Sequence, residues 1–206
     1  MNRNEAIELI RLRTGQDHVA GWDERIRLEL EMAQTSLEWS AVLPWFLINV
    51  DDTLSVTAGT ATLTLPTGFL RLGPQGGLYR HDDTRDDPWV GLQRDTYETL
   101  SARNLGSGTV AYYALLGNTV HLFPTPASTT GFRLIHFKSG GSLATNTATN
   151  PWLVHAPEVL LHEAAARIDP ARTGLWLELA EKEKTRIGMH DDQRHFDAIN
   201  PRIIPE

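Results

Sequence analysis

The strongest periodic pattern of hydrophobic and polar residues covers residues 22–40. Apolar side chains recur there at the spacing of one face of an α-helix, at Trp22, Ile26, Leu30, Ala33 and Leu37. The acidic residues of this stretch fall mostly on other faces. Leu28, Met32 and Trp39 are apolar but lie outside the main stripe, which leaves open a second buried side of this helix.

Three further segments have the pattern of helices. A short amphipathic segment near the N-terminus stops at Gly15, and Pro157 and Pro170 each stand where the first turn of a helix tolerates proline. Gly188 is expected to end the last helix. The expected helices cover residues 4–14, 22–40, 157–168 and 170–187.

Residues 54–65 alternate between apolar and hydroxylated side chains, which is typical of a half-buried β-hairpin. A two-residue loop at Ala58-Gly59 would pair Leu54 with Leu63. In that register one face carries threonines and Ser55. The other, core-facing face carries Leu54, Val56, Ala61, Leu63 and Leu65.

Residues 112–123 predict a second hairpin around a Gly117-Asn118 turn. Its core face carries Tyr113, Leu115, Val120 and Leu122. The opposite face is also unusually apolar for a surface. Since strands that are apolar on both sides are either central in a sandwich or pressed on a neighbour, we predict a subunit interface at Tyr112, Leu116 and Phe123.

The remaining segments are less regular. Residues 66–92 are rich in glycine and proline and contain an acidic run at Asp82, Asp83, Asp86 and Asp87, for which a solvated loop is expected. A short helix over 95–103 has Asp95 as its candidate N-cap. Residues 189–206 lack helical periodicity, yet four apolar side chains indicate an extended docking arm: Phe196, Ile199, Ile203 and Ile204.

The order of elements predicts an α+β fold. The N- and C-terminal helices are expected to pack together beside an antiparallel, sandwich-like β-meander over residues 50–138. Residues 1–188 would form a single domain, followed by the arm at 189–206.

Composition and net charge limit the classes of function that fit the chain. The chain has 206 residues and a net charge of −7, from 26 acidic and 19 basic side chains, which argues against tight binding to nucleic acid. There is no cysteine, no signal-peptide pattern and no apolar run that would span a bilayer, so we expect assembly in a reducing cytoplasm and no membrane contact.

Candidate chemistry is sparse. His162-Glu163 resembles the start of a zinc-protease motif, but Ala166 stands where the second histidine ligand is needed. His155, Glu158 and His162 leave a looser metal site open, with packing or surface roles as the better interpretation. No phosphate-binding loop is present. We therefore predict no catalytic residue, no metal, no cofactor and no enzyme activity.

Four stretches resemble the bacteriophage head-to-tail adaptor family, also called tail tubular protein A or gatekeeper. They are "TLTLP" at 62–66, "YALLGNTVHLFPTP" at 113–126, "FRLIHFKSGGSL" at 132–143 and "PEVLLHEAAARI" at 157–168. The resemblance implies a structural virion protein, found in the neck or tail, that binds the portal and a tail or nozzle protein.

It also implies a ring, usually of twelve copies, that surrounds the DNA exit channel. Twelve copies at −7 give a net charge on the order of −80, and acidic groups such as those at 82–87 would let double-stranded DNA pass without specific binding. The alternative from a different class is a β-sandwich module that binds a glycan or another surface, with six tryptophans available for stacking.

Overall fold

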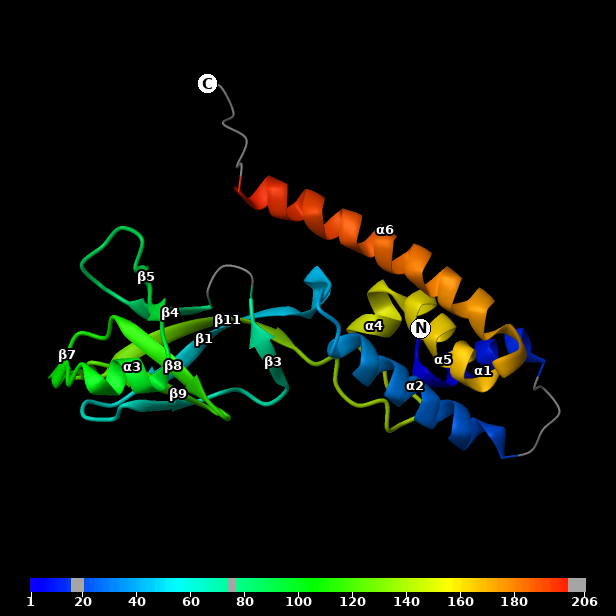
Figure 1. Ribbon diagram of the computed structural model, residues 1–206, viewed down its shortest axis with the longest axis horizontal. Helices are drawn as coiled ribbons and strands as arrows, with labels where there is room; N and C mark the ends of the chain where they lie inside the picture. The colour runs from blue at the N-terminus through cyan, green and yellow to red at the C-terminus, as the bar shows by residue number, and fades with distance from the viewer. Residues whose placement is uncertain (16–20, 74–76, 200–206) are drawn as a thin grey trace, which may run out of the picture. The chain divides into compact units, whose positions relative to one another are not determined.

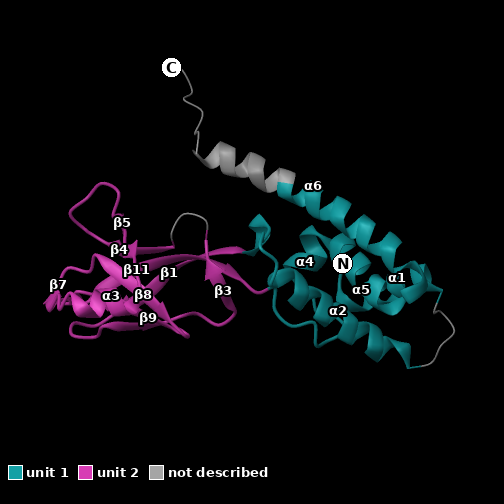
Figure 2. Ribbon diagram, viewed as in Figure 1, with its two compact units in different colours: residues 1–47, 140–206 teal, residues 48–139 magenta. Residues whose placement is uncertain are grey.

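The chain folds into two compact units. The computed structural model describes residues 1–15, 21–73 and 77–199, with side chains as far as Gly188. Residues 1–47 and the chain from Gly140 onward form the helical unit, and residues 48–139 form the β unit (Figure 2). The single domain expected over 1–188 stays a prediction, because compactness does not decide whether two units fold as one.

The helical unit combines segments from both ends of the chain (Figure 1). Asn2 and Glu5 form a capping box at its first helix, which ends at Gly15 in the left-handed conformation. The elements are α1 (Arg3–Thr14), α2 (Trp22–Glu38), α4 (Pro151–His155), α5 (Pro157–Ile168) and α6 (Thr173–Ile199), with 3-10 turns η1 (Trp45–Leu47) and η2 (Pro170–Arg172).

Helix α5 is the centre of this unit, because it packs against α1, α2, α4 and α6. It has the bounds that its sequence predicts, with Pro157 at the first position. Leu160 and Ala164 are fully buried, and Leu161 and Ala165 are almost so, which leaves little polar surface on the helix. The predicted stripe of α2 also points into this core, as shown by its fully buried members Ile26, Leu30 and Ala33.

The predicted end of the last helix at Gly188 is wrong. Helix α6 continues to Ile199. A glycine inside a helix costs only about 1 kcal/mol relative to alanine, and no proline follows before Pro201. Continued backbone hydrogen bonding outweighs a signal of that size. Residues 189–199 of the predicted extended arm are therefore helical, whereas 200–206 lie outside the described residues.

The β unit contains two main sheets and one small helix. The first sheet has the order β1 (Ile48–Val56), β11 (Thr130–Lys138), β4 (Leu78–His81) and β5 (Trp89–Gly91), with β3 (Phe69–Leu72) also paired to β11. The second has the order β2 (Thr62–Thr64), β9 (Thr119–Phe123), β8 (Tyr112–Leu116) and β6 (Gln93–Arg94). The remaining elements are α3 (Tyr97–Ala102), β7 (Ser107–Gly108) and β10 (Thr125–Pro126).

Most strand pairs are antiparallel. The two short pairs β6–β8 and β7–β10 are parallel, and the others run in opposite directions. The predicted hairpin at 112–123 is confirmed, since Tyr113 faces Leu122 and Leu115 faces Val120. The short helix begins later than expected, because Thr96 rather than Asp95 is the N-cap of α3.

The hairpin predicted at 54–65 is wrong. Leu54 in β1 faces Phe132 of the first sheet, and Leu63 in β2 faces Val120 of the second. Gly59, between the two strands, has a φ of 80°, which glycine adopts readily. The tight turn is real, but it carries the chain from one sheet to the other instead of folding it back.

The inner faces of the two sheets share one core, as the sandwich-like prediction requires. Val56, Leu63 and Leu65 are buried there, so the alternation identified the inward face correctly even where it gave the wrong partner. Residues 66–92 contain β3, β4 and β5, strands of three or four residues that are too short to show a clear period. The α+β fold class is confirmed. None of the described helices is long and apolar enough to cross a membrane.

Candidate interaction surfaces

The outer face of the β8–β9 hairpin, predicted as a subunit interface, is partly covered by α3. The ring of Tyr97 lies 5.9 Å from that of Phe123, centroid to centroid. The guanidinium carbon of Arg103 lies 5.2 Å above the ring of Tyr112. Tyr112 and Phe123 are consequently half-buried, whereas Leu116, next to the turn, is 54% exposed.

Leu116 is therefore the most open of the three predicted interface residues. The strand pattern showed that the outer face is apolar, and a short helix was predicted over 95–103, but the sequence did not show that this helix packs on that face. The interface at Tyr112, Leu116 and Phe123 stays a prediction.

The four aspartates of the acidic run lie on the turn between β4 and β5 (Figure 1). The Asp82 carboxylate accepts hydrogen bonds from the hydroxyl and backbone N–H of Thr84 and pairs with Arg80 at 3.0 Å, and these contacts lower the pKa of Asp82. Asp82 thus shapes the turn. Three carboxylates remain exposed to solvent, those of Asp83, Asp86 and Asp87.

The apolar residues of the predicted arm lie at or beyond the limit of the described chain. Phe196 and Ile199 belong to the last part of α6, where the backbone is described and the side chains are not. Ile203 and Ile204 lie outside the described residues. Their docking role stays a prediction.

A second apolar face lies on α2 and the residue after it. Leu28 and Met32 are about half exposed, and Trp39, the C-cap residue, is 83% exposed. At 100° per residue these three side chains share a narrow sector opposite Ile26 and Leu30. These residues were not predicted as an interface, although their spacing of four and seven residues indicates a shared side of the helix.

A comparison with protein families gives a match over residues 1–202 to the family described as SU10 adaptor protein. The chain belongs to this family. SU10 adaptor proteins are phage head-tail adaptors, so the predicted resemblance to head-to-tail adaptors is confirmed. A comparison with curated proteins finds no match.

As an SU10 adaptor protein, the chain is a structural component of the phage virion and not an enzyme. An adaptor connects other virion proteins, so it must present surfaces that bind them. This membership favours the connector over the alternative of a free-standing glycan-binding module.

The histidines that suggested a metal site have packing roles in this SU10 adaptor protein. The Arg13 guanidinium donates to both carboxylate oxygens of Glu158, at 2.6 and 3.0 Å, and lowers the pKa of that carboxyl. His162 lies 3.4 Å from Glu158 and stacks on Trp176, and burial lowers its pKa. His155 packs in an aromatic cluster instead. In the part of the chain that the structure describes, no group of three His, Asp or Glu residues could hold a metal.

Proposed function

We propose that this adaptor forms a ring of twelve copies between the portal and the tail or nozzle, assembled in the host cytoplasm, and that the ring lines the DNA exit channel. The observation that carries the proposal is the second apolar face of α2, formed by Leu28, Met32 and Trp39. Large apolar side chains exposed together on one side of a helix are typical of a surface that a partner covers. A closed ring, in turn, needs a contact between two different surfaces of identical subunits.

The charge of the chain supports passage of DNA without specific binding. A net charge of −7 per copy gives the ring a charge on the order of −80. Tight DNA binding depends on cationic groups that displace counterions from the phosphates, and an acidic surface opposes this. We assign the exposed carboxylates of Asp83, Asp86 and Asp87 to the channel surface.

Assembly on portal rings tests the proposal. Purified adaptor is mixed with portal rings, and complexes are counted by gel filtration and negative-stain microscopy. The wild-type chain should give complexes with twelvefold adaptor density, whereas Met32→Ser with Trp39→Ser should lower occupancy at least tenfold. Asp23→Asn, an exposed position on the opposite side of the same helix, is the matched control and should assemble normally. Absence of any complex with wild-type adaptor would refute the ring.

The acidic loop has a separate test. Asp83, Asp86 and Asp87 are changed together to asparagine, while Asp82 is kept because it shapes the turn. Phage that carry this variant should eject DNA more slowly in low salt, since weaker repulsion lets the duplex adhere. The difference should shrink in high salt, where charges are screened. Equal ejection rates of wild-type and variant phage at both salt concentrations would show that the loop does not line the channel.

A further inference from the structure

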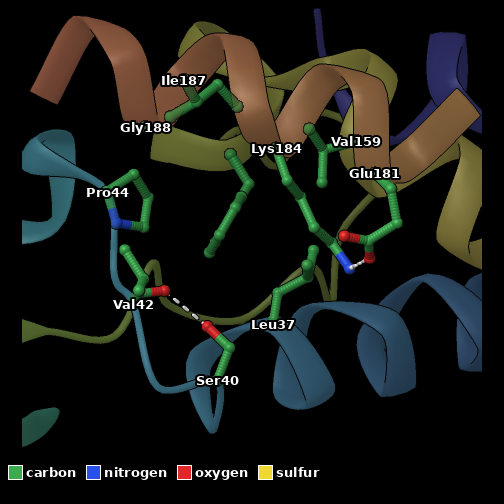
Figure 3. A pocket seen from close by; sticks show the side chains of 10 residues that line it. Leu37, Ser40, Val42, Pro44, Val159, Glu181, Lys184, Ile187 and Gly188 are labelled. Carbon is green, nitrogen blue, oxygen red and sulfur yellow. Dashed lines mark hydrogen bonds and ion pairs between the residues drawn. The ribbon is translucent and has the colours of Figure 1, made fainter.

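The helical unit contains a pocket of about 460 Å³ beneath α6 (Figure 3). Pockets of this size hold ligands larger than a single side chain. Its walls come from the end of α2 and the following segment, from α4 and α5, and from one side of α6. The apolar part of the lining consists of Leu37, Val42, Pro44, Trp152, Val159 and Ile187.

The polar groups in the pocket wall already have partners. The Lys184 ammonium donates to Glu163 at 2.6 Å and to Glu181 at 2.8 Å. The Ser40 hydroxyl donates to a backbone carbonyl, and the Trp152 indole donates to Glu38. A polar ligand would have to break these bonds, so the pocket suits an apolar occupant.

Gly188 is the unusual residue of this wall. It follows Glu181 and Lys184 at spacings of seven and four residues, and therefore lies on the same side of α6. A Cβ added to Gly188 would meet no heavy atom within 4 Å, and its backbone does not have the left-handed φ that favours glycine. Within the described residues the glycine leaves open space at the pocket, which allows the backbone of a bound segment to approach closely.

We infer that the pocket receives Ile203 and Ile204 from a second copy of this chain. These two side chains supply adjacent apolar groups, and Pro201 and Pro205 on either side restrict the backbone and reduce the entropy lost on binding. Arg202 precedes them, and its guanidinium could share the carboxylate of Glu181, which accepts from Lys184 and stays 70% exposed at the pocket.

The length of chain after the pocket favours a second copy over the same copy. From Gly188 to Ile199 the helix rises by about 16 Å. Ile203 and Ile204 follow Ile199 by four and five residues, which span at most about 18 Å when fully extended. A return to the pocket of the same copy would use that whole length and leave no residue to reverse the direction.

This contact is between two different surfaces, as a closed ring requires. It therefore rests on the proposed ring and names one of its contacts. A short apolar segment binds weakly when free, but attachment to a neighbouring subunit raises its effective concentration to roughly the millimolar range. A modest affinity is then sufficient in the assembled ring.

Peptide binding to the full chain tests the inference without a ring. The receptor carries I203D and I204D, so that its own segment cannot compete, and the probe is a fluorescein-labelled peptide of residues 199–206, INPRIIPE. Anisotropy should show saturable binding, and Gly188→Leu in the receptor should weaken it at least tenfold by filling the pocket. Gly174→Leu, also in α6 and also without neighbours around an added Cβ, is the matched control and should bind within twofold of the parent.

The indole N–H signal of Trp152, assigned with Trp152→Phe, reports occupancy of the pocket and should shift with the peptide. Lack of binding, equal binding by the Gly188→Leu receptor, or an unmoved Trp152 signal would overturn the inference. The Trp152 signals of the wild-type chain and of the I203D/I204D chain should coincide at dilutions where both chains are monomers. A difference there would also overturn the inference, because the segment would then occupy the pocket of its own copy. Failure of the ring itself is read separately, from wild-type adaptor on portal rings.

Discussion

The two units differ in how far a local pattern determines their structure. In the helical unit, local signals gave the bounds of α5 and the buried face of α2, which ends at Glu38, two residues before the predicted end. In the β unit, an equally clear alternation gave the buried face of Leu54 and Leu63 but the wrong partner strand. A helix satisfies its hydrogen bonds within itself, whereas a strand depends on a partner that can be far away in sequence.

The units also differ in whether another element covers a second apolar face. The β unit covers the outer side of β8 and β9 with α3, which leaves Leu116 exposed at the edge. In the described part of the helical unit, no element covers Met32 and Trp39, which stay exposed. The helical unit thus leaves uncovered a kind of face that the β unit covers in part.

The largest expected effect comes from breaking one core at a time. Phe132→Ala removes a fully buried ring from β11, which pairs with β1, β3 and β4, and should lower the free energy of unfolding by about 3–5 kcal/mol. Leu160→Ala removes a fully buried side chain from α5 and should cost about 2–5 kcal/mol. Denaturant unfolding measures both.

Hydrogen exchange then shows whether the two cores are independent. Phe132→Ala should raise amide exchange in residues 48–139 and spare α5, and Leu160→Ala should do the reverse. If each variant raises exchange equally in both units, the chain unfolds as one cooperative domain. The expected single domain would then be right, and the contrast between the units would not extend to their stability.

Sequence alone therefore predicted the fold class and the buried faces correctly, but it identified only part of the exposed apolar surface. Leu28, Met32 and Trp39 were visible as apolar residues off the main stripe, yet periodicity cannot show whether another element covers them. The helix at 95–103 was predicted, but its packing over Phe123 was missed because its one buried residue, Leu100, does not show which surface the helix contacts. The helical continuation past Gly188 was missed because one glycine is a weak stop signal.

The pocket in the helical unit could not be predicted from the sequence either. Its lining joins Leu37, Trp152 and Gly188, which are far apart along the chain and have no shared motif. Only the packing of three helices brings them together. The same is true of the carboxylate of Glu38, which accepts from residues more than a hundred positions away.

The second-largest effect is expected at Glu38, a long-range contact inside the helical unit. Its Oε1 accepts from Gln34 Nε2 at 2.9 Å, from the backbone N–H of Gly140 at 2.9 Å and from the Trp152 indole at 3.2 Å. Glu38→Ala removes the acceptor of the Gly140 N–H and the Trp152 indole, whereas Gln34 Nε2 keeps the Gly141 carbonyl, and the change should cost about 1–3 kcal/mol. Ser36→Ala, an exposed position of the same helix, serves as control and should stay within about 0.5 kcal/mol.

Chemical denaturation of both variants gives the numbers. A loss at Glu38 no larger than at Ser36 would show that these long-range hydrogen bonds do not stabilise the helical unit, which would then depend on its apolar core and on local helix formation.

Acid sensitivity should be shared between the units, because each buries one histidine among the residues whose side chains are described. Burial lowers the pKa of His136 in the β unit and of His162 in the helical unit below the ordinary value of 6.5. Below about pH 6.5 the unfolded chain therefore binds protons that the folded chain does not, and the free energy of unfolding should fall as the pH falls from 6.5 towards 5. Carboxyl groups with lowered pKa act only at lower pH, as for Glu158.

Unfolding curves at pH 7.5, 6.5 and 5.5 measure this slope. His136→Leu and His162→Leu should each remove part of it. Asp51 and Lys138 act on His136, and Glu158 and Arg13 act on His162, so the two parts need not be equal. A slope that neither substitution changes would mean that the histidines do not set the acid response.

The smallest effect on stability is expected at Leu116. This side chain is 54% exposed at the end of β8, so Leu116→Ser should change the free energy of unfolding by no more than about 0.5 kcal/mol. Leu115, its neighbour on the opposite face, packs against the core of the β unit, and Leu115→Ser should cost clearly more.

In assembly on portal rings, Leu116→Ser should weaken binding less than Met32→Ser with Trp39→Ser. Equal destabilisation by the two leucine variants would mean that the outer face serves folding and not assembly. A Leu116 variant that changes neither measurement would show that Leu116 takes no part in the subunit contacts.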